Sequence, residues 1–274
     1  MPLSFPESHT APPPSLLAVF AHPDDESLFA GGTLARYATT GARTAVVTAT
    51  WTPDTHRAAE LAEALRILGT TGPDLLGYAD ARVPESAPGR PRLCDAPLDE
   101  TVRRLVRRLR GFRPDIVVTH DPYGNVTGHP DHVHTHRVTV LAVQAAGLEG
   151  LYPDAGEPWS PGALYLATHP HSAAASLGEL ARAGTTLYTV PDDCVGAVLD
   201  VRPWLERKWA AVLAHRSEVE RGAAPGRLAG LPAAVREEIL GTEWYIRYDT
   251  GPGSLSGAGL RLLLDPVRPG RPSR

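Results

Sequence analysis

Short apolar runs alternate with longer amphipathic segments over the first half of the chain. Four runs rich in apolar and β-branched residues predict strands, at 16–20, 43–50, 74–78 and 115–120. Between and after them, apolar residues recur every three or four positions and predict four helices, over 27–41, 56–69, 98–112 and 130–147. Repeated strand–helix units of this kind indicate an α/β fold with a mostly parallel sheet and helices on both faces.

Beyond about residue 150 the periodic signals are weaker and more mixed. Four more segments have the character of strands, at 163–168, 186–190, 195–201 and 243–250, and one long amphipathic segment, 203–222, predicts a helix. We expect this smaller α+β extension, residues 151–265, to complete the same domain and its pocket. Residues 15–150 are the predicted core of the domain.

The two ends of the chain and one internal segment have a different composition. Residues 1–14 lack the basic and apolar regions of an export signal, so we interpret them as a disordered tail, and residues 266–274 as a frayed end. The segment 79–97 is rich in proline and glycine and is predicted to be a surface loop that carries binding groups. These features favour a cytoplasmic protein.

Composition narrows the function classes. The 274 residues are 42% hydrophobic and 21% charged, which suits one large globular domain. A formal charge of -4 gives no basic field for nucleic acid, and no apolar stretch approaches the roughly 20 residues of a membrane span.

The two cysteines, Cys94 and Cys194, lie far apart and predict reduced thiols. The single lysine, Lys208, and the many arginine, alanine and proline residues indicate a GC-rich bacterial source.

Two polar clusters follow predicted strands. The sequence "HPDDE", residues 22–26, comes directly after the first strand, and "HPDHVHTH", residues 129–136, follows the strand that ends at His120. Ligands of open parallel sheets bind at the carboxyl ends of the strands, so both clusters are expected at one edge of the sheet.

Imidazole and carboxylate are the side chains that hold zinc or ferrous iron in proteins. His22 and Asp25 are spaced to hold one ion from a single turn. The second cluster offers four imidazoles, at least one of which should complete the set, namely His129, His132, His134 and His136.

The two motifs "AHPDDE" and "GHPDHVHTH" together resemble those of the LmbE-like or PIG-L superfamily of metal-dependent N-acetylglucosaminyl deacetylases. Bacterial members include the deacetylase and the S-conjugate amidase of mycothiol metabolism. The resemblance extends over roughly residues 15–220 and implies a Rossmann-like sheet. It also implies a zinc hydrolase, with ferrous iron as the alternative native metal, that acts on the acyl group of an N-acylated amino sugar.

The resemblance also implies roles for individual residues. Asp24 would be the general base that deprotonates the attacking water. A protonated His129 would face the scissile carbonyl and help to stabilise the oxyanion, with Asp131 orienting its ring. The implied metal ligands are His22, Asp25 and His132.

Two further positions match substrate-binding positions of the family. The segment "HRAAELAEALRILG" implies that Arg57 contacts substrate hydroxyls, and "LGYADARVPE" implies the same for Asp80. An arginine and an aspartate suit a polyol, which offers both hydrogen-bond donors and acceptors.

The chain departs from the family pattern at positions that choose the substrate. Trp51 stands in the turn after the second strand, where we expect an aromatic wall of the pocket. Thr127 occupies the position of a family tyrosine, whose hydroxyl Tyr123 would have to replace. Glu218 in "AHRSE" stands where the family has an amide.

Plainer roles also exist for several of these residues. Glu26 and Ser27 suit the first turn of a helix, where acidic and hydroxyl side chains complement the helix dipole. His134 and His136 fit surface or supporting positions, His215 a structural one, and the arginine run of residues 103–110 a solvated helix face.

Three substrate classes stay open from the sequence: an N-acetylated amino sugar, an S-conjugate of such a sugar, and a glycosylated secondary metabolite. A nucleotide-binding module is disfavoured, because three carboxylates after the first strand would repel phosphate. A catalytically inactive sugar-binding relative is also disfavoured, since every expected ligand and the base are present. The oligomeric state stays open, a homo-oligomer included.

Overall fold

The computed structural model describes residues 12–178, 180 and 186–250, and a seven-stranded sheet is the centre of that part. The strand order is β3-β2-β1-β4-β5-β7-β6. Strands β3 to β5 in this order are parallel, whereas β7 runs antiparallel to both β5 and β6. The strands are β1 Leu16–Phe20, β2 Thr44–Thr50, β3 Thr71–Tyr78, β4 Ile116–His120, β5 Ala163–Thr168, β6 Ala197–Asp200 and β7 Thr242–Asp249.

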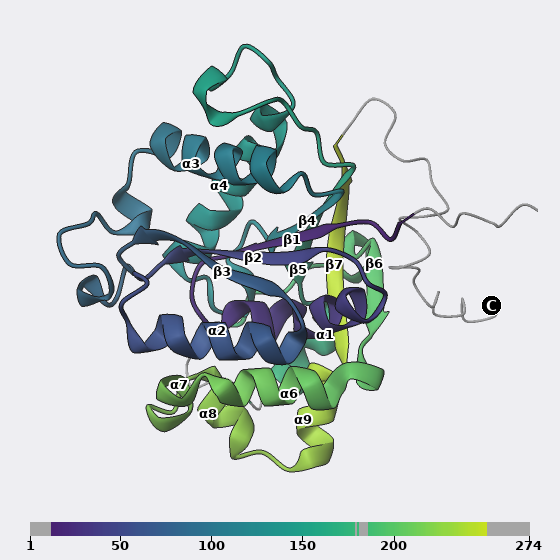
Figure 1. Ribbon diagram of the computed structural model, residues 1–274. Coiled ribbons are helices and arrows are strands. Elements are labelled where there is room, and N and C mark those ends of the chain that lie inside the picture. Colours follow the sequence, from purple (N-terminus) through teal and green to yellow (C-terminus); the bar gives the residue numbers. More distant parts are fainter. Residues whose placement is uncertain (1–11, 179, 181–185, 251–274) are drawn as a thin grey trace, which may run out of the picture.

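Helices cover both faces of the sheet (Figure 1). One face carries α3 (Leu98–Phe112) and α4 (Pro130–Ala146). The opposite face carries α1 (Asp25–Thr39), α2 (His56–Leu68) and α6 (Leu205–Ala214). Four shorter helices complete the described part, namely α5 Ala174–Gly178, α7 Arg216–Glu220, α8 Ala224–Ala229 and α9 Ala233–Leu240.

Strand β1 shows why the first apolar run is buried on both sides. Leu16, Ala18 and Phe20 belong to the core cluster under α1, α2 and α6. Leu17 and Val19 belong to the cluster under α3 and α4. Successive side chains of a strand point to opposite faces, so a strand covered by helices on both faces reads as a continuous apolar run.

The predicted α/β architecture is confirmed, with two local errors. Residues 186–190 are not a strand, because Val190 forms only one bridge, to Pro170, and neither Pro170 nor Pro191 has an N–H to extend a ladder. The helix predicted over 203–222 is broken at His215, whose ψ of 64° lies outside the helical range. The predicted tails, 1–14 and 266–274, lie outside the described residues except for 12–14.

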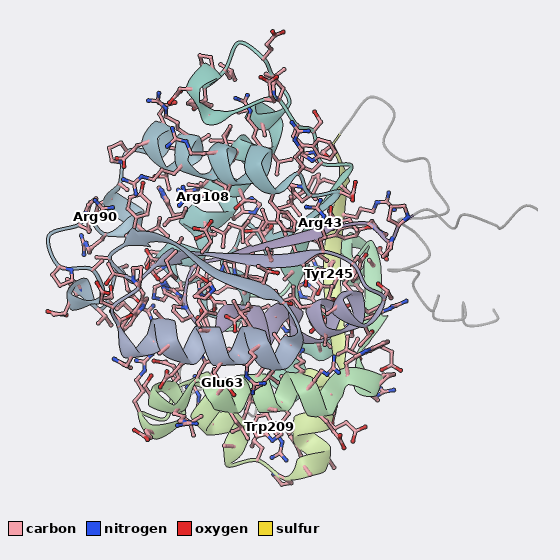
Figure 2. All side chains as sticks on the ribbon, in the orientation of Figure 1. Arg43, Glu63, Arg90, Arg108, Trp209 and Tyr245 are labelled. Carbon is pink, nitrogen blue, oxygen red and sulfur yellow. The ribbon has the colours of Figure 1, made fainter. Side chains whose placement is uncertain are left out.

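The C-terminal strands join the same sheet as the core and are anchored by a buried ion pair. Lys208 of α6 lies 2.8 Å from Glu243 of β7, and both are buried. Glu243 also accepts hydrogen bonds from the backbone N–H groups of Gly32 and Thr33 in α1. Figure 2 shows the side chains, Tyr245 among them, that fill the space between sheet and helices.

One arginine of the run on α3 is not solvated. Arg110 is buried and donates hydrogen bonds to backbone carbonyl groups at the end of α4 and in the loop after it, including those of Ala146, Leu148 and Tyr152. The last carbonyl groups of a helix lack partners within the helix, and this guanidinium supplies them. The prediction of a solvated face is therefore wrong for Arg110.

The loop after β3, both cysteines and the helix lengths bear on three further expectations. The loop 79–97 contains two short 3-10 helices, Pro84–Ser86 and Leu93–Asp95. Both cysteines are free thiols. No helix in the described ranges has the length and apolar character needed to cross a membrane.

Candidate metal centre

The turn after β1 is folded back on itself by its own carboxylates. The backbone N–H of His22 donates to Asp25 Oδ2 at 2.8 Å, and the N–H of Asp24 donates to Glu26 Oε2 at 3.0 Å. Asp24 has a φ of 130°, which a non-glycine residue adopts only at a cost of about 1–3 kcal/mol. The carboxylates of the motif therefore hold a strained backbone that turns Asp24 and Asp25 toward the edge of the sheet.

The turn after β4 brings the second motif to the same edge. Gly124 and Gly128 have positive φ, and a Cβ at Gly124 would lie 3.0 Å from the carbonyl oxygen of His129. His129 is the N-cap of α4, with Pro130 in the first turn. His132 follows three residues later, so both imidazoles lie on one side of the first helical turn.

Three side chains from the two turns meet within hydrogen-bonding distance. His22 Nδ1 lies 3.2 Å from His132 Nε2 and 3.4 Å from Asp25 Oδ2, and His132 Nε2 lies 3.3 Å from Asp25 Oδ1. Ligand atoms about 2.0–2.1 Å from a tetrahedral zinc ion are separated by about 3.3 Å. The spacing of these nitrogen and oxygen atoms therefore fits a zinc ion.

The outer nitrogens of the two imidazoles are already used. His132 Nδ1 lies 3.1 Å from the carbonyl oxygen of Gly124, and His22 Nε2 lies 3.2 Å from Asp131 Oδ2. Both partners are acceptors, so in the neutral rings the outer nitrogens carry the protons and the inner nitrogens keep their lone pairs. Such partners commonly fix the orientation of metal-binding histidines.

His120 lies beneath this cluster but has no free nitrogen. Its ring stacks on that of His132 with centroids 4.0 Å apart. Its Nε2 accepts the backbone N–H of Ala21 at 3.1 Å, and its Nδ1 bonds to Asn125 Oδ1. His120, Asp25 and His132 are close enough together to hold a metal ion. Because both nitrogens of His120 are already hydrogen-bonded, we interpret this ring as a support for the cluster and not as a ligand.

Distance alone admits two other sets of ligand atoms. His22, His129 and His132 lie within reach of one ion, as do His22, Asp80, His129 and Asp131. His136 contacts the carbonyl of His120, and His134 is partly buried outside these sets.

The contacts of Asp131 differ from those expected. Its carboxylate binds His22 Nε2 and the backbone N–H of Ala81, whereas it lies 3.9 Å from His129 Nδ1. The backbone N–H of Asp131 donates to His129 Nδ1 at 3.2 Å. The main chain of Asp131 therefore orients His129, and its carboxylate orients His22.

Charges in this pocket shift several pKa values. Burial opposes a charge on His22, but hydrogen bonds to Asp131 and Asp25 raise its pKa to about 10. Burial also opposes ionisation of Asp25, yet His132 and His120 hold its pKa well below the usual range. Burial, with His22 and His132 nearby, lowers the pKa of His129 to about 2. These surroundings favour a neutral His129, whereas the family resemblance implies a protonated ring.

Asp24 is held by an arginine. Arg57 Nη2 lies 3.3 Å from Asp24 Oδ1 and also donates to the carbonyl of Pro23, while Nη1 lies 3.0 Å from Glu218 Oε1. Burial raises the pKa of Asp24 to about 7, and the charge of Arg57 opposes this rise. Arg57 was expected to bind substrate, but its side chain is 4% exposed and most of its donors are used within the protein.

These residues surround a cavity of about 450 Å³. Its polar side includes Arg57, Asp80, Arg82, Glu218 and Arg221. The predicted catalytic and ligand residues that line it are His22, Asp24, Asp25, His129 and His132.

Two substrate-side expectations are not met. Trp51 lies under the guanidinium of Arg57, with its ring 4.8 Å away, and is not part of the lining of this cavity. Tyr123 is 53% exposed and also lies outside the lining, which includes Thr127 instead. The Trp51 ring therefore packs against Arg57, and Arg57 contacts Asp24, the proposed base.

The sequence did not indicate a buried pair that supports Asp24. Glu26 and His215 are both fully buried, with His215 Nε2 2.9 Å from Glu26 Oε1. The imidazole lowers the pKa of Glu26 against the effect of burial. Because Glu26 also accepts the N–H of Asp24, the pair links the end of α6 to the backbone of the base.

Comparisons with known proteins agree with this geometry. A family model described as GlcNAc-PI de-N-acetylase (PIG-L) matches residues 17–143. The 1D-myo-inositol 2-acetamido-2-deoxy-alpha-D-glucopyranoside deacetylase of Mycobacterium leprae is 38% identical over 280 residues, which cover 85% of this chain and 89% of the relative. The enzyme of the same name from Rhodococcus erythropolis is 34% identical and covers 86% of this chain and 92% of its own length. The chain belongs to the PIG-L family.

A solved structure also resembles this PIG-L family member. The conserved protein TT1542 from Thermus thermophilus is 29% identical, with a TM-score of 0.58 over 86% of this chain and 94% of its own. The family and fold predicted from the two motifs are confirmed.

Proposed function

We propose that this chain is a metal-dependent de-N-acetylase that hydrolyses the acetamide of 1D-myo-inositol 2-acetamido-2-deoxy-α-D-glucopyranoside. The reaction class follows from the PIG-L family, and the substrate from the names of relatives that cover most of the chain. The observation that carries the proposal is the meeting of His22 Nδ1, His132 Nε2 and the Asp25 carboxylate at 3.2–3.4 Å beside Asp24.

His22, Asp25 and His132 would hold the metal. Their two neutral imidazoles and one carboxylate are a donor set of the kind that zinc prefers in catalytic sites, and ferrous iron also accepts it. When bound, zinc would lower the pKa of a coordinated water to about 7 and polarise the substrate carbonyl.

Asp24 would accept the proton of the attacking water. Its Oδ1 is held by Arg57, and its backbone by Glu26, so the carboxylate is fixed before substrate arrives. General-base assistance of this kind is worth about a hundredfold to ten-thousandfold in rate. As the carbon–nitrogen bond breaks, Asp24 would deliver this proton to the leaving nitrogen, so that acetate and the free amino sugar depart.

His129 would stabilise the oxyanion with the Nε2–H group. Its Nδ1 accepts the N–H of Asp131, so Nε2 carries the proton in the neutral ring, and His129 is among the residues that line the cavity. A fixed donor aimed at a developing negative charge is a large catalytic effect in a water-poor site. Asp80 and Arg82, on the polar side of the cavity, would bind sugar and inositol hydroxyls.

Amine release from this substrate tests the proposal. Protein purified without chelator would be analysed for zinc and iron, and the new primary amine followed with time. We expect about one metal per chain and release that stops on treatment with a chelator and returns on adding zinc. Metal-loaded protein that releases no amine from this substrate would contradict the proposed function.

A further inference from the structure

A second cavity, the apolar chamber, lies beside the catalytic one. It has a volume of about 110 Å³, and its main apolar lining residues are Leu28, Phe29, Val126, Leu177, Leu228 and Ile239. Arg227 is the one charged residue that lines it among the residues that the structure describes. Protein interiors are close-packed and apolar cavities can bind small apolar groups, so a space of this size next to a reaction site is a candidate binding site for part of a substrate.

The apolar chamber adjoins the reaction site and shares walls with it. The residues that line both cavities are Leu28, Phe29, Thr127, Ala224 and Arg227. The Phe29 ring lies 6.1 Å from that of His132 on one side and 6.1 Å from that of His169 on the other. The Phe29 ring, which lines the apolar chamber, is therefore a near neighbour of His132, a proposed metal ligand.

Apart from Arg227, the described residues that line the apolar chamber carry no charge. Burial lowers the pKa of His169 to about 3, so its ring is neutral at physiological pH. Leu177 and Leu228 are at most 3% exposed. Three residues of the lining, Thr127, His169 and Arg227, carry polar side-chain groups, so a polar sugar would lose most of its hydrogen bonds to water here.

The two ends of an amide substrate point in opposite directions from the carbonyl carbon. The nitrogen leads to the sugar, whose hydroxyls suit the polar side of the catalytic cavity near Asp80 and Arg82. The acyl carbon leads away from it. If the sugar lies on the polar side, the acyl group would extend toward Phe29, which borders the apolar chamber.

We infer that this chain accepts N-acyl amino sugars whose acyl group is longer than acetyl, with the aliphatic tail in the apolar chamber. This inference rests on the proposed function. A cavity of about 150 Å³ binds benzene in another protein, so about 110 Å³ suits a tail of a few carbons. Each buried methylene can raise kcat/KM by up to about fourfold.

A chain-length series tests the inference on the metal-loaded enzyme. The kcat/KM values for N-acetyl, N-butanoyl and N-hexanoyl glucosaminyl-inositol would be compared. We expect the butanoyl substrate to exceed the acetyl one by about threefold or more. A fall from acetyl to butanoyl would overturn the inference but leave the deacetylase function intact, whereas hydrolysis of none of them would overturn both.

An octyl N-acetylglucosaminide separates the two ends of the substrate. If the octyl aglycone raises kcat/KM and acyl lengthening does not, the apolar chamber binds the sugar side and the inference fails.

Two neighbouring positions on α8 provide matched variants. Leu228 lines the apolar chamber, whereas Ala229 is exposed. We expect Leu228→Trp to lower the butanoyl-to-acetyl ratio of kcat/KM by about fivefold or more, and Ala229→Trp to leave it within twofold. If Leu228→Trp does not fold, Val126→Phe narrows the same space. An unchanged ratio in a folded, narrowed variant would contradict the inference.

Discussion

Two parts of the site are built on different principles. The histidine turns, residues 21–26 and 120–132, place lone pairs and carboxylate oxygens toward the cavity. The C-terminal support, residues 205–220, contributes His215 and Glu218, whose side chains bond back to Glu26 and Arg57. The first part carries the groups that would react, and the second fixes where they stand.

This difference predicts that substitutions in the histidine turns abolish chemistry in a folded protein. Substitutions in the C-terminal support should instead reduce stability and activity together. Four single substitutions, two in each part, test that division.

His132→Ala should remove both metal and activity. It deletes one of the three proposed ligands and leaves His22 Nδ1 facing only Asp25. We expect the metal content to fall well below one per chain and amine release to fall by at least about a thousandfold, because both the bound water and the polarised carbonyl are lost. His134→Ala, on the same helix, is the matched control and should keep its metal; equimolar metal in His132→Ala would contradict the ligand assignment.

Asp24→Asn should remove proton transfer but not the metal. The amide keeps the shape of the side chain and cannot act as a base at neutral pH. We expect kcat to fall by about a hundredfold to ten-thousandfold, with KM and metal content little changed. A loss of less than tenfold would show that another group takes the proton.

His215→Ala should act mainly through stability. It leaves the carboxylate of Glu26 buried without its charged partner, and breaking a buried pair in this way costs about 3–5 kcal/mol. Urea unfolding would measure the loss, and we expect kcat to fall by about tenfold because Glu26 also holds the backbone of Asp24. Adding Glu26→Gln should restore part of the stability by removing the unpaired charge; if the double variant is no more stable, the pair is not the cause.

Glu218→Gln should have the smallest effect. The amide oxygen can still accept from Arg57, and only the charge of the contact at 3.0 Å is lost. We expect kcat/KM to change by less than about fivefold, measured beside Asp24→Asn. A loss of fiftyfold or more would place Glu218 among the reacting groups instead of the support.

The same division explains what could be predicted from the sequence. His22, Asp25 and His132 stand in short motifs after strands, and parallel strands bring such motifs to one edge of the sheet. Spacing alone left four histidines open in the second motif, and the choice of His132 came from the family resemblance. The structure shows why His132 can reach the site: it lies in the first turn of α4, on the same side as His129.

The support could not be predicted because it depends on contacts between distant segments. Nothing local at His215 indicates Glu26, which lies 189 residues away, and nothing in the arginine run singles out Arg110 for the end of α4. Trp51 was expected to meet substrate, but the chain turns so that its ring packs under Arg57.

Anomalous diffraction at the zinc edge, from crystals of the metal-loaded protein, would show whether His22, Asp25 and His132 hold one metal ion. We expect one strong peak within about 2.0–2.2 Å of His22 Nδ1, His132 Nε2 and an Asp25 oxygen. A peak on the alternative set of Asp80, His129 and Asp131, or no peak between the two histidine turns, would contradict this ligand assignment.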